Sequence, residues 1–184
     1  MMYPYWAWKK ELSSETCDKI IEESLNFDQQ VGLTNASLTG TVTEAPPKSS
    51  RISKVRWVQN NEFIYSLVVR YFNVANRNFG VDISSVFDIQ FTEYKGDEKG
   101  HYNWHIDSFT NNPGYDRKLS LVIQLSDPSD YEGGVFSFFD GVPEEFKERG
   151  SIIVFPSFRP HRVEPVTKGL RYSLVSWIEG PSWR

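Results

Sequence analysis

Two short β-strands are predicted by residues 161–178, which read HRVEPVTKGLRYSLVSWI. Because side chains alternate along a strand, every second residue of the later strand shares one face: Arg171, Ser173, Val175 and Trp177. A guanidinium on this largely apolar face lies in the interior and needs a partner. The partner is either a structural Asp or Glu from elsewhere in the chain or the carboxylate of a ligand, which a guanidinium holds bidentately.

Further strands are predicted upstream, and they are short and separated by Gly, Pro and Asp. They cover residues 51–59, 86–94, 102–107, 118–125, 135–139 and 151–155. Two segments with helical spacing of apolar residues come before most of them, at 13–27 and 60–79, and Gly80 is well placed to end the second. This order predicts a mainly β sandwich or barrel, with the N-terminal helices packed on one outer face.

Length, amino-acid composition and net charge exclude or disfavour several classes of protein. A chain of 184 residues is the size of one ordinary domain, and 15% aromatic residues exclude a disordered chain. The net charge of -4 disfavours a nucleic-acid partner. With Cys17 as the one cysteine, no internal disulfide or cysteine-based zinc cluster can form. We expect a cytoplasmic protein, because no secretion signal or long apolar run is evident.

The candidate metal ligands come from a small set, since the chain has three histidines. His105 and Asp107 are two residues apart, so on a strand both side chains would face the same way. Zinc, manganese and iron(II) all accept such a pair, and it specifies none of them. His161 would complete a two-histidine, one-carboxylate set, which is typical of non-haem Fe(II) oxygenases. His101 is expected at the surface or rim of the site.

The residues from Phe91 to Trp183 resemble the Fe(II)/2-oxoglutarate-dependent dioxygenases. Within this superfamily the similarity is to the prolyl 4-hydroxylase-like group, in its bacterial-type, PKHD-like branch. The matching motifs are Tyr94, YNWHID (102–107), LSL (119–121), LSDP (125–128), YEGGV (131–135), GSIIVFP (150–156) and HRVEPVTKGLRYS (161–173). They cover about half of the chain.

The resemblance implies a double-stranded β-helix, the cupin-like jelly-roll. One domain over residues 1–184 is expected, with helical support and a loop in 1–80 and the jelly-roll core in 81–184. By position, the iron ligands would be His105, Asp107 and His161. Arg171 would hold the distal carboxylate of 2-oxoglutarate, assisted by the cofactor-binding residues Tyr94 and Ser173. The cofactors implied are Fe(II), 2-oxoglutarate and O2, with ascorbate as an optional reductant.

The expected activity is hydroxylation of an unactivated C–H bond, with release of succinate and CO2. The first choice of substrate is a prolyl residue of a peptide or protein, placed in a mouth rimmed by Tyr102, Trp104 and Phe109. A free amino acid or small metabolite, or a non-catalytic metal-binding jelly-roll, is the alternative. A nucleic-acid demethylase is disfavoured, since Trp177 stands where those enzymes carry a second arginine. Loops 31–50 and 108–117 are expected to border the mouth. No membrane partner is expected, and the oligomeric state stays open.

Overall fold

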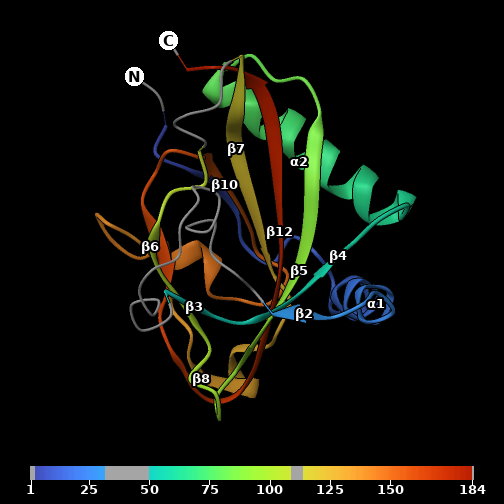
Figure 1. The fold of residues 1–184 in the computed structure, drawn as a ribbon, viewed down its shortest axis with the longest axis vertical. Helices are drawn as coiled ribbons and strands as arrows, with labels where there is room; N and C mark the ends of the chain where they lie inside the picture. The colour runs from blue at the N-terminus through green and yellow to red at the C-terminus, as the bar shows by residue number, and fades with distance from the viewer. Residues whose placement is uncertain (1–2, 32–49, 109–113, 184) are drawn as a thin grey trace, which may run out of the picture.

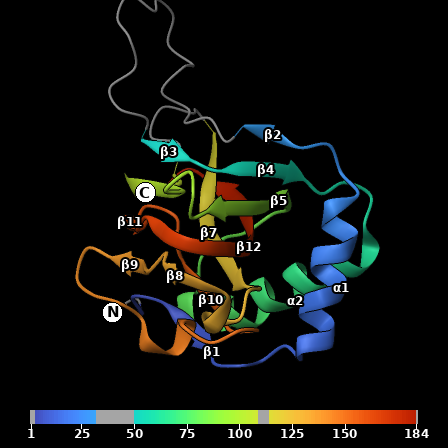
Figure 2. The ribbon, with the colours of Figure 1, turned by 90° about the horizontal axis from the view of Figure 1, so that it is seen from below.

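The computed structural model describes residues 3–31, 50–108 and 114–183. Two antiparallel β-sheets face each other, and both α-helices lie on one side of them (Figure 1, Figure 2). In the described part of the chain the larger sheet has eight strands in the order β1-β10-β7-β12-β5-β4-β2, with β8 paired to β12. The smaller sheet has four strands in the order β3-β6-β11-β9. The predicted jelly-roll fold is confirmed.

The described strands include one in every segment predicted from the sequence, but three of them lie outside these segments, and the predicted strand 51–59 is divided between the two sheets. In the larger sheet they are β1 (Trp6–Trp8), β2 (Gln30–Val31), β4 (Lys54–Trp57), β5 (Val86–Lys95), β7 (Tyr115–Gln124), β8 (Tyr131–Gly133), β10 (Ile152–Pro156) and β12 (Val166–Pro181). In the smaller sheet they are β3 (Arg51–Ile52), β6 (His101–His105), β9 (Phe136–Phe138) and β11 (His161–Val163).

The two helices begin and end at residues that favour helix termini. The first, α1 (Ser14–Leu25), is capped by the Ser13 side chain, which accepts a hydrogen bond from the Thr16 backbone N–H. The second, α2 (Glu62–Phe79), ends at Gly80 in the left-handed conformation, with φ of 65°. Both predicted helix boundaries are therefore correct to within two residues.

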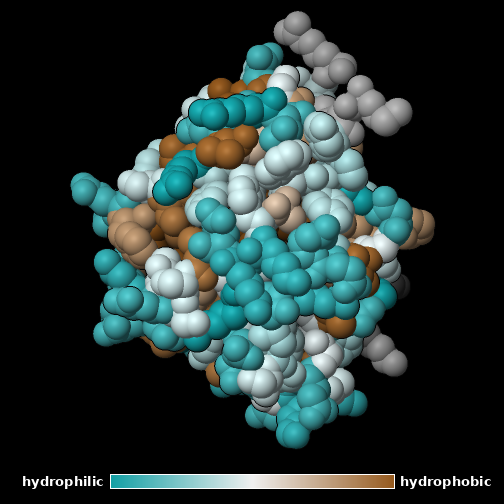
Figure 3. All heavy atoms as spheres, turned by 180° about the vertical axis from the view of Figure 1, so that it is seen from behind, coloured by the Kyte–Doolittle hydropathy of each residue, from teal (hydrophilic) through white to brown (hydrophobic). Residues whose placement is uncertain are grey.

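Two apolar clusters hold these layers together. One lies between the helices and the larger sheet, and it joins Ile20, Val68 and Phe72 to Leu121 and Ile123. The two helices carry polar side chains on the side away from this cluster. The view from behind shows a mostly hydrophilic surface (Figure 3). The other cluster lies between the two sheets and includes Phe136, Phe155 and Val163. Among the described residues, no helix is both long and apolar enough to cross a membrane.

The first 80 residues do more than support the core. Besides both helices, they supply β1, β2 and β4 to the larger sheet and β3 to the smaller one. The expected division at residue 80 therefore does not separate the helical part from the sheets. Most of the predicted loop 31–50 and the centre of loop 108–117, including Phe109, lie outside the described residues.

Candidate metal centre

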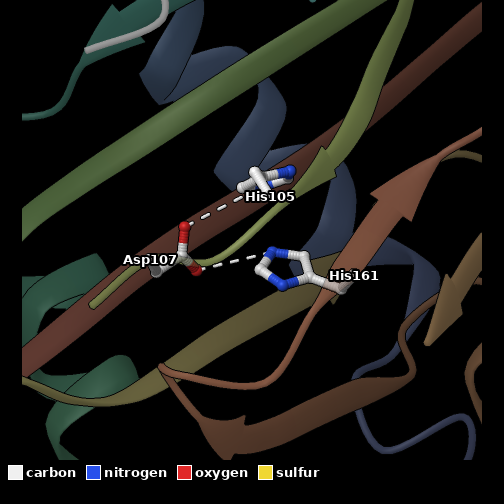
Figure 4. Close-up of side chains that lie close together, drawn as sticks. All are labelled: His105, Asp107 and His161. Carbon is white, nitrogen blue, oxygen red and sulfur yellow. Dashed lines mark ion pairs between the residues drawn. The ribbon is translucent and has the colours of Figure 1, made fainter. Parts of the chain in front are cut away.

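His105, Asp107 and His161 converge between the two sheets (Figure 4). One possible ligand atom from each residue lies within 4.8 Å of the others. The Nε2 atom of His105 is 3.7 Å from Asp107 Oδ1, and the Nε2 atom of His161 is 3.5 Å from Asp107 Oδ2. Two imidazoles and one carboxylate on one side of a cavity fit an Fe(II) ion with open coordination positions.

Backbone pairing sets the positions of the two histidines. His161 of β11 is the cross-strand partner of His105 in β6, and the two rings are 4.1 Å apart. Each Nδ1 contacts a backbone carbonyl oxygen two residues earlier, that of Asn103 at 2.7 Å and that of Arg159 at 2.9 Å. These contacts fix the ring orientation, so that both Nε2 atoms face the carboxylate.

Asp107 lies just beyond the end of β6, so its position depends on contacts with β7 and with the segment after β10. Its backbone N–H donates to the Ser157 carbonyl oxygen at 2.8 Å. The Ser120 hydroxyl donates to Asp107 Oδ2 at 2.7 Å, and the Ser120 and Ser157 hydroxyls are 2.9 Å apart. Neither serine was identified as a site residue from the sequence, although Ser120 lies in a predicted strand with alternating side chains.

Charge and burial prepare these groups to bind a cation. Burial, followed by the neighbouring His161, lowers the pKa of His105, so its imidazole is neutral and its nitrogen free to ligate at neutral pH. Burial alone would raise the pKa of Asp107, but His161, His105 and the Ser120 hydrogen bond together lower it. The carboxylate is therefore ionised near neutral pH.

Replacing Ser120 with alanine is expected to weaken metal binding by about 10- to 100-fold, the usual cost of losing a group that orients a ligand. The variant keeps all three ligands but frees the carboxylate to rotate. Mn(II) affinity measured by calorimetry tests this, with Ser120→Thr as the matched variant that retains the hydroxyl. If Ser120→Ala and the parent bind Mn(II) equally well, the proposed orienting role is wrong.

A cavity of about 240 Å³ contains the three candidate ligands. Arg171, Tyr94 and Ser173 also line it, each of them buried. Arg171 and Tyr94 are a cross-strand pair of β12 and β5, and the guanidinium carbon lies 5.6 Å from the tyrosine ring centre. The structure therefore brings all six predicted site residues into one cavity.

Arg171 is a buried charge in this cavity with two unsatisfied donor atoms. It is 1% exposed, and neither Nε nor Nη1 has a hydrogen-bond partner among the described residues. These two atoms therefore form no ion pair with a structural Asp or Glu of the described residues, which was one of the two partners predicted for Arg171. A buried guanidinium without a protein carboxylate fits a ligand that supplies one.

The structure corrects the predicted mouth of the cavity. Trp104 does not line it but packs outside against Phe139 and is 42% exposed. Trp104 is next to the inward-facing His105 and therefore lies on the opposite face of β6. Tyr102 is turned inward by an irregularity in the β6–β11 register, where His161 pairs with His105 but Val163 pairs with Tyr102. This bulge shifts the alternation, so Tyr102 and His105 both face inward and their rings stack at 3.5 Å.

His101 lies outside the group of candidate ligands, as expected. Its Nδ1 contacts the Lys99 carbonyl oxygen at 2.8 Å, and its side chain does not line the cavity. The cavity wall also contains two arginines and two tryptophans that are not among the predicted site residues: Arg51, Arg117, Trp57 and Trp177.

Comparison with known proteins identifies relatives of the chain. The family model of the 2OG-Fe(II) oxygenase superfamily matches residues 89–179. A PKHD-type hydroxylase of Synechococcus sp. (strain CC9902) is 42% identical over 80 residues, which is 42% of this chain but only 36% of the relative. A PKHD-type hydroxylase of Nitrosomonas europaea is 29% identical over 174 residues, 88% of this chain and 76% of the relative. The match thus spans about a third of the first relative's length and about three quarters of the second's.

Solved structures share the fold. The viral collagen prolyl hydroxylase of Paramecium Bursaria Chlorella virus-1 superposes with a TM-score of 0.69 at 19% identity, covering 97% of both chains. A Pseudomonas putida prolyl-4-hydroxylase gives 0.69 at 18% identity, covering 98% of this chain and 94% of that one. The solved structures show the shared fold alone, whereas the family match over residues 89–179 and the PKHD-type relatives identify the chain as a PKHD-like member of the 2OG-Fe(II) oxygenase superfamily.

Proposed function

We propose that this protein is an Fe(II)- and 2-oxoglutarate-dependent dioxygenase. It hydroxylates an unactivated C–H bond of a prolyl residue in a peptide or protein and releases succinate and CO2. The observation that carries the proposal is the buried Arg171, whose Nε and Nη1 have no partner among the described residues, in the same cavity as His105, Asp107 and His161. A non-catalytic metal-binding module would have no use for a carboxylate clamp beside its metal.

In this proposal His105, Asp107 and His161 hold the iron from one side and leave the opposite positions open. Arg171 binds the distal carboxylate of 2-oxoglutarate, and the neighbouring Tyr94 and Ser173 side chains fix the direction of that carboxylate. With its ligands bound, the iron supplies the oxidising power for C–H cleavage. The contribution of the chain is to orient the cosubstrate and the substrate around it and to limit access of water.

One wall of the cavity, next to Asp107, is suited to a ring and a carbonyl group, since Trp177 is the cross-strand partner of the Ser120 that bonds Asp107. Trp57 and Trp177 line the cavity with ring centres 6.4 Å apart, and the Arg117 guanidinium lies 4.0 Å from the centre of the Trp177 ring. An aromatic wall packs against a pyrrolidine ring, and a guanidinium donates hydrogen bonds to a peptide carbonyl. The names of similar proteins also support a prolyl substrate, since they include a prolyl-4-hydroxylase and a collagen prolyl hydroxylase.

Succinate release measured with a panel of proline-containing peptides tests the proposed substrate class. We expect the iron-loaded protein to release succinate with at least one such peptide and to add one oxygen atom to it. Free L-proline and other amino acids are the matched comparison. Ascorbate is proposed as an accessory reductant, so adding it should prolong succinate release.

Two results would distinguish an error in the proposed substrate from an error in the proposed reaction. Stimulation by a free amino acid alone, with no oxidised peptide, would reassign the substrate to small molecules and leave the reaction type standing. Absence of succinate release under every condition, despite Fe(II) and 2-oxoglutarate binding, would contradict the enzymatic proposal.

A further inference from the structure

Arg171 lines two cavities, of which the metal centre occupies one. The second, which we call the rear cavity, has a volume of about 180 Å³ and lies among β7, β8, β12 and the short helix Glu144–Phe146. The two cavities have only Arg171 and Phe136 in common among their lining residues. Arg171 and Phe136 therefore lie between the two cavities.

The Arg171 guanidinium has more N–H donors than one ligand carboxylate uses, so some are available to an acceptor in the rear cavity. Five N–H groups are available on an arginine, and a bidentate carboxylate uses two of them. Within the described structure, the buried Nε and Nη1 atoms have no protein acceptor. A cosubstrate on one edge of the guanidinium thus leaves donors that a second acceptor can satisfy.

Gln124 supplies an unsatisfied hydrogen-bond acceptor that complements the Arg171 donors. It is 1% exposed and lines the rear cavity but not the front one. Its Nε2 donates to the Tyr131 hydroxyl at 2.7 Å and to the Ser126 carbonyl oxygen at 3.2 Å. These two bonds fix the amide, and Oε1 is left buried without a donor in the described residues. Leaving such an acceptor unsatisfied is costly.

Much of the remaining wall of the rear cavity is apolar, Lys147 of this wall is paired with Glu144, and a glycine keeps the space open. Phe136 and Phe146 form part of its wall. A Cβ atom at Gly134 would lie 2.9 Å from Arg171 Cδ and 2.8 Å from Val166 Cγ2, and the φ of 61° disfavours other residues there. Glycine at this position thus preserves both the course of the Arg171 side chain and the space behind it.

We propose that the rear cavity binds a small organic carboxylate that carries a hydrogen-bond donor on an apolar body, that is, a hydroxy acid. Its carboxylate accepts from Arg171, its hydroxyl donates to Gln124 Oε1, and its body packs against Phe136 and Phe146. The inference rests on the proposed function, because Arg171 is also the 2-oxoglutarate clamp. Two carboxylates then share one positive charge, so each ligand weakens the binding of the other, and by the same factor.

The test uses Mn(II)-loaded protein and the probe 3-fluoro-4-hydroxybenzoate, detected by fluorine NMR, with 4-fluorobenzoate as the probe that lacks the hydroxyl. Calorimetry measures 2-oxoglutarate affinity on the same samples. Val142 is partly exposed at the edge of the rear cavity, and the variant Val142→Trp is designed to fill that cavity. Leu25→Trp, on an exposed position of α1, is the matched control.

We expect saturable binding of the hydroxylated probe to the parent and to Leu25→Trp, weaker binding of 4-fluorobenzoate, and loss of probe binding in Val142→Trp. Saturating probe should weaken 2-oxoglutarate binding by about fivefold or more, whereas Val142→Trp alone should leave it within about twofold. The proposal is overturned if the probe does not bind while 2-oxoglutarate does, or if Val142→Trp binds the probe like the parent. Complete displacement of the probe by 2-oxoglutarate, which would place the probe in the front cavity, overturns it too. Failure of 2-oxoglutarate itself to bind would instead contradict the proposed function.

Discussion

Replacing His161 with alanine is expected to abolish 2-oxoglutarate-dependent succinate release. The substitution removes one of three ligands and leaves His105 and Asp107 to hold the metal with fewer bonds. A ligand set this small holds divalent iron weakly, and the two remaining side chains no longer define one face for the cosubstrate. Succinate release and Mn(II) affinity, measured on the same preparation, check both consequences.

The matched control is His101→Ala, because His101 is the histidine outside the ligand cluster. It should retain succinate release close to that of the parent. His161 also packs against Phe155, with ring centres 4.8 Å apart, so circular dichroism and the melting temperature are needed to show that His161→Ala remains folded. A folded His161→Ala variant with full turnover would refute the assignment of the triad.

Arg171→Ala should weaken 2-oxoglutarate binding by about a hundredfold or more. Removing one partner of a buried charge pair costs about 2–5 kcal/mol, much of it for leaving the ligand carboxylate without a cation. About 2.7 kcal/mol already corresponds to a hundredfold change in the dissociation constant. Calorimetric titration of 2-oxoglutarate into the Mn(II)-loaded variant measures this loss directly, without requiring turnover.

The variant Arg171→Lys distinguishes the contribution of the positive charge from that of the bidentate geometry. Lysine keeps the positive charge but lacks the bidentate fork, so we expect an affinity between those of the parent and Arg171→Ala. Arg77→Ala, which removes an exposed arginine from the last turn of α2, should leave 2-oxoglutarate affinity unchanged. An unaltered affinity in Arg171→Ala would show that another group binds the distal carboxylate.

The features that could be predicted from the sequence are those that follow strand periodicity. Alternation along residues 171–178 places Arg171 inside, and the structure shows it buried and facing the cavity. The helix boundaries followed from a serine cap and from Gly80. We also propose a single domain, since strands from both parts of the chain pair with one another.

The features that could not be predicted depend on register and on contacts between distant segments. A register shift between the His161 and Val163 pairs turns Tyr102 to the same side as His105, whereas strict alternation from His105 places Tyr102 with Trp104 on the outer face. The hydrogen bonds of Ser120 and Ser157 to Asp107 join residues from separate elements, and neither serine stands in a metal-binding pattern of its own. Gly134 likewise is understandable only once the Arg171 side chain is known to pass beside it.

Because His105 and His161 are paired across β6 and β11, metal binding also depends on correct folding of the smaller sheet. Side chains reverse their direction with each residue along a strand, so a slip of one position would turn one imidazole away from the other. A misregistered molecule could retain secondary structure and much of its apolar packing, yet it would have no complete set of ligands. Metal occupancy in a refolded sample would therefore count the molecules whose smaller sheet has assembled in register.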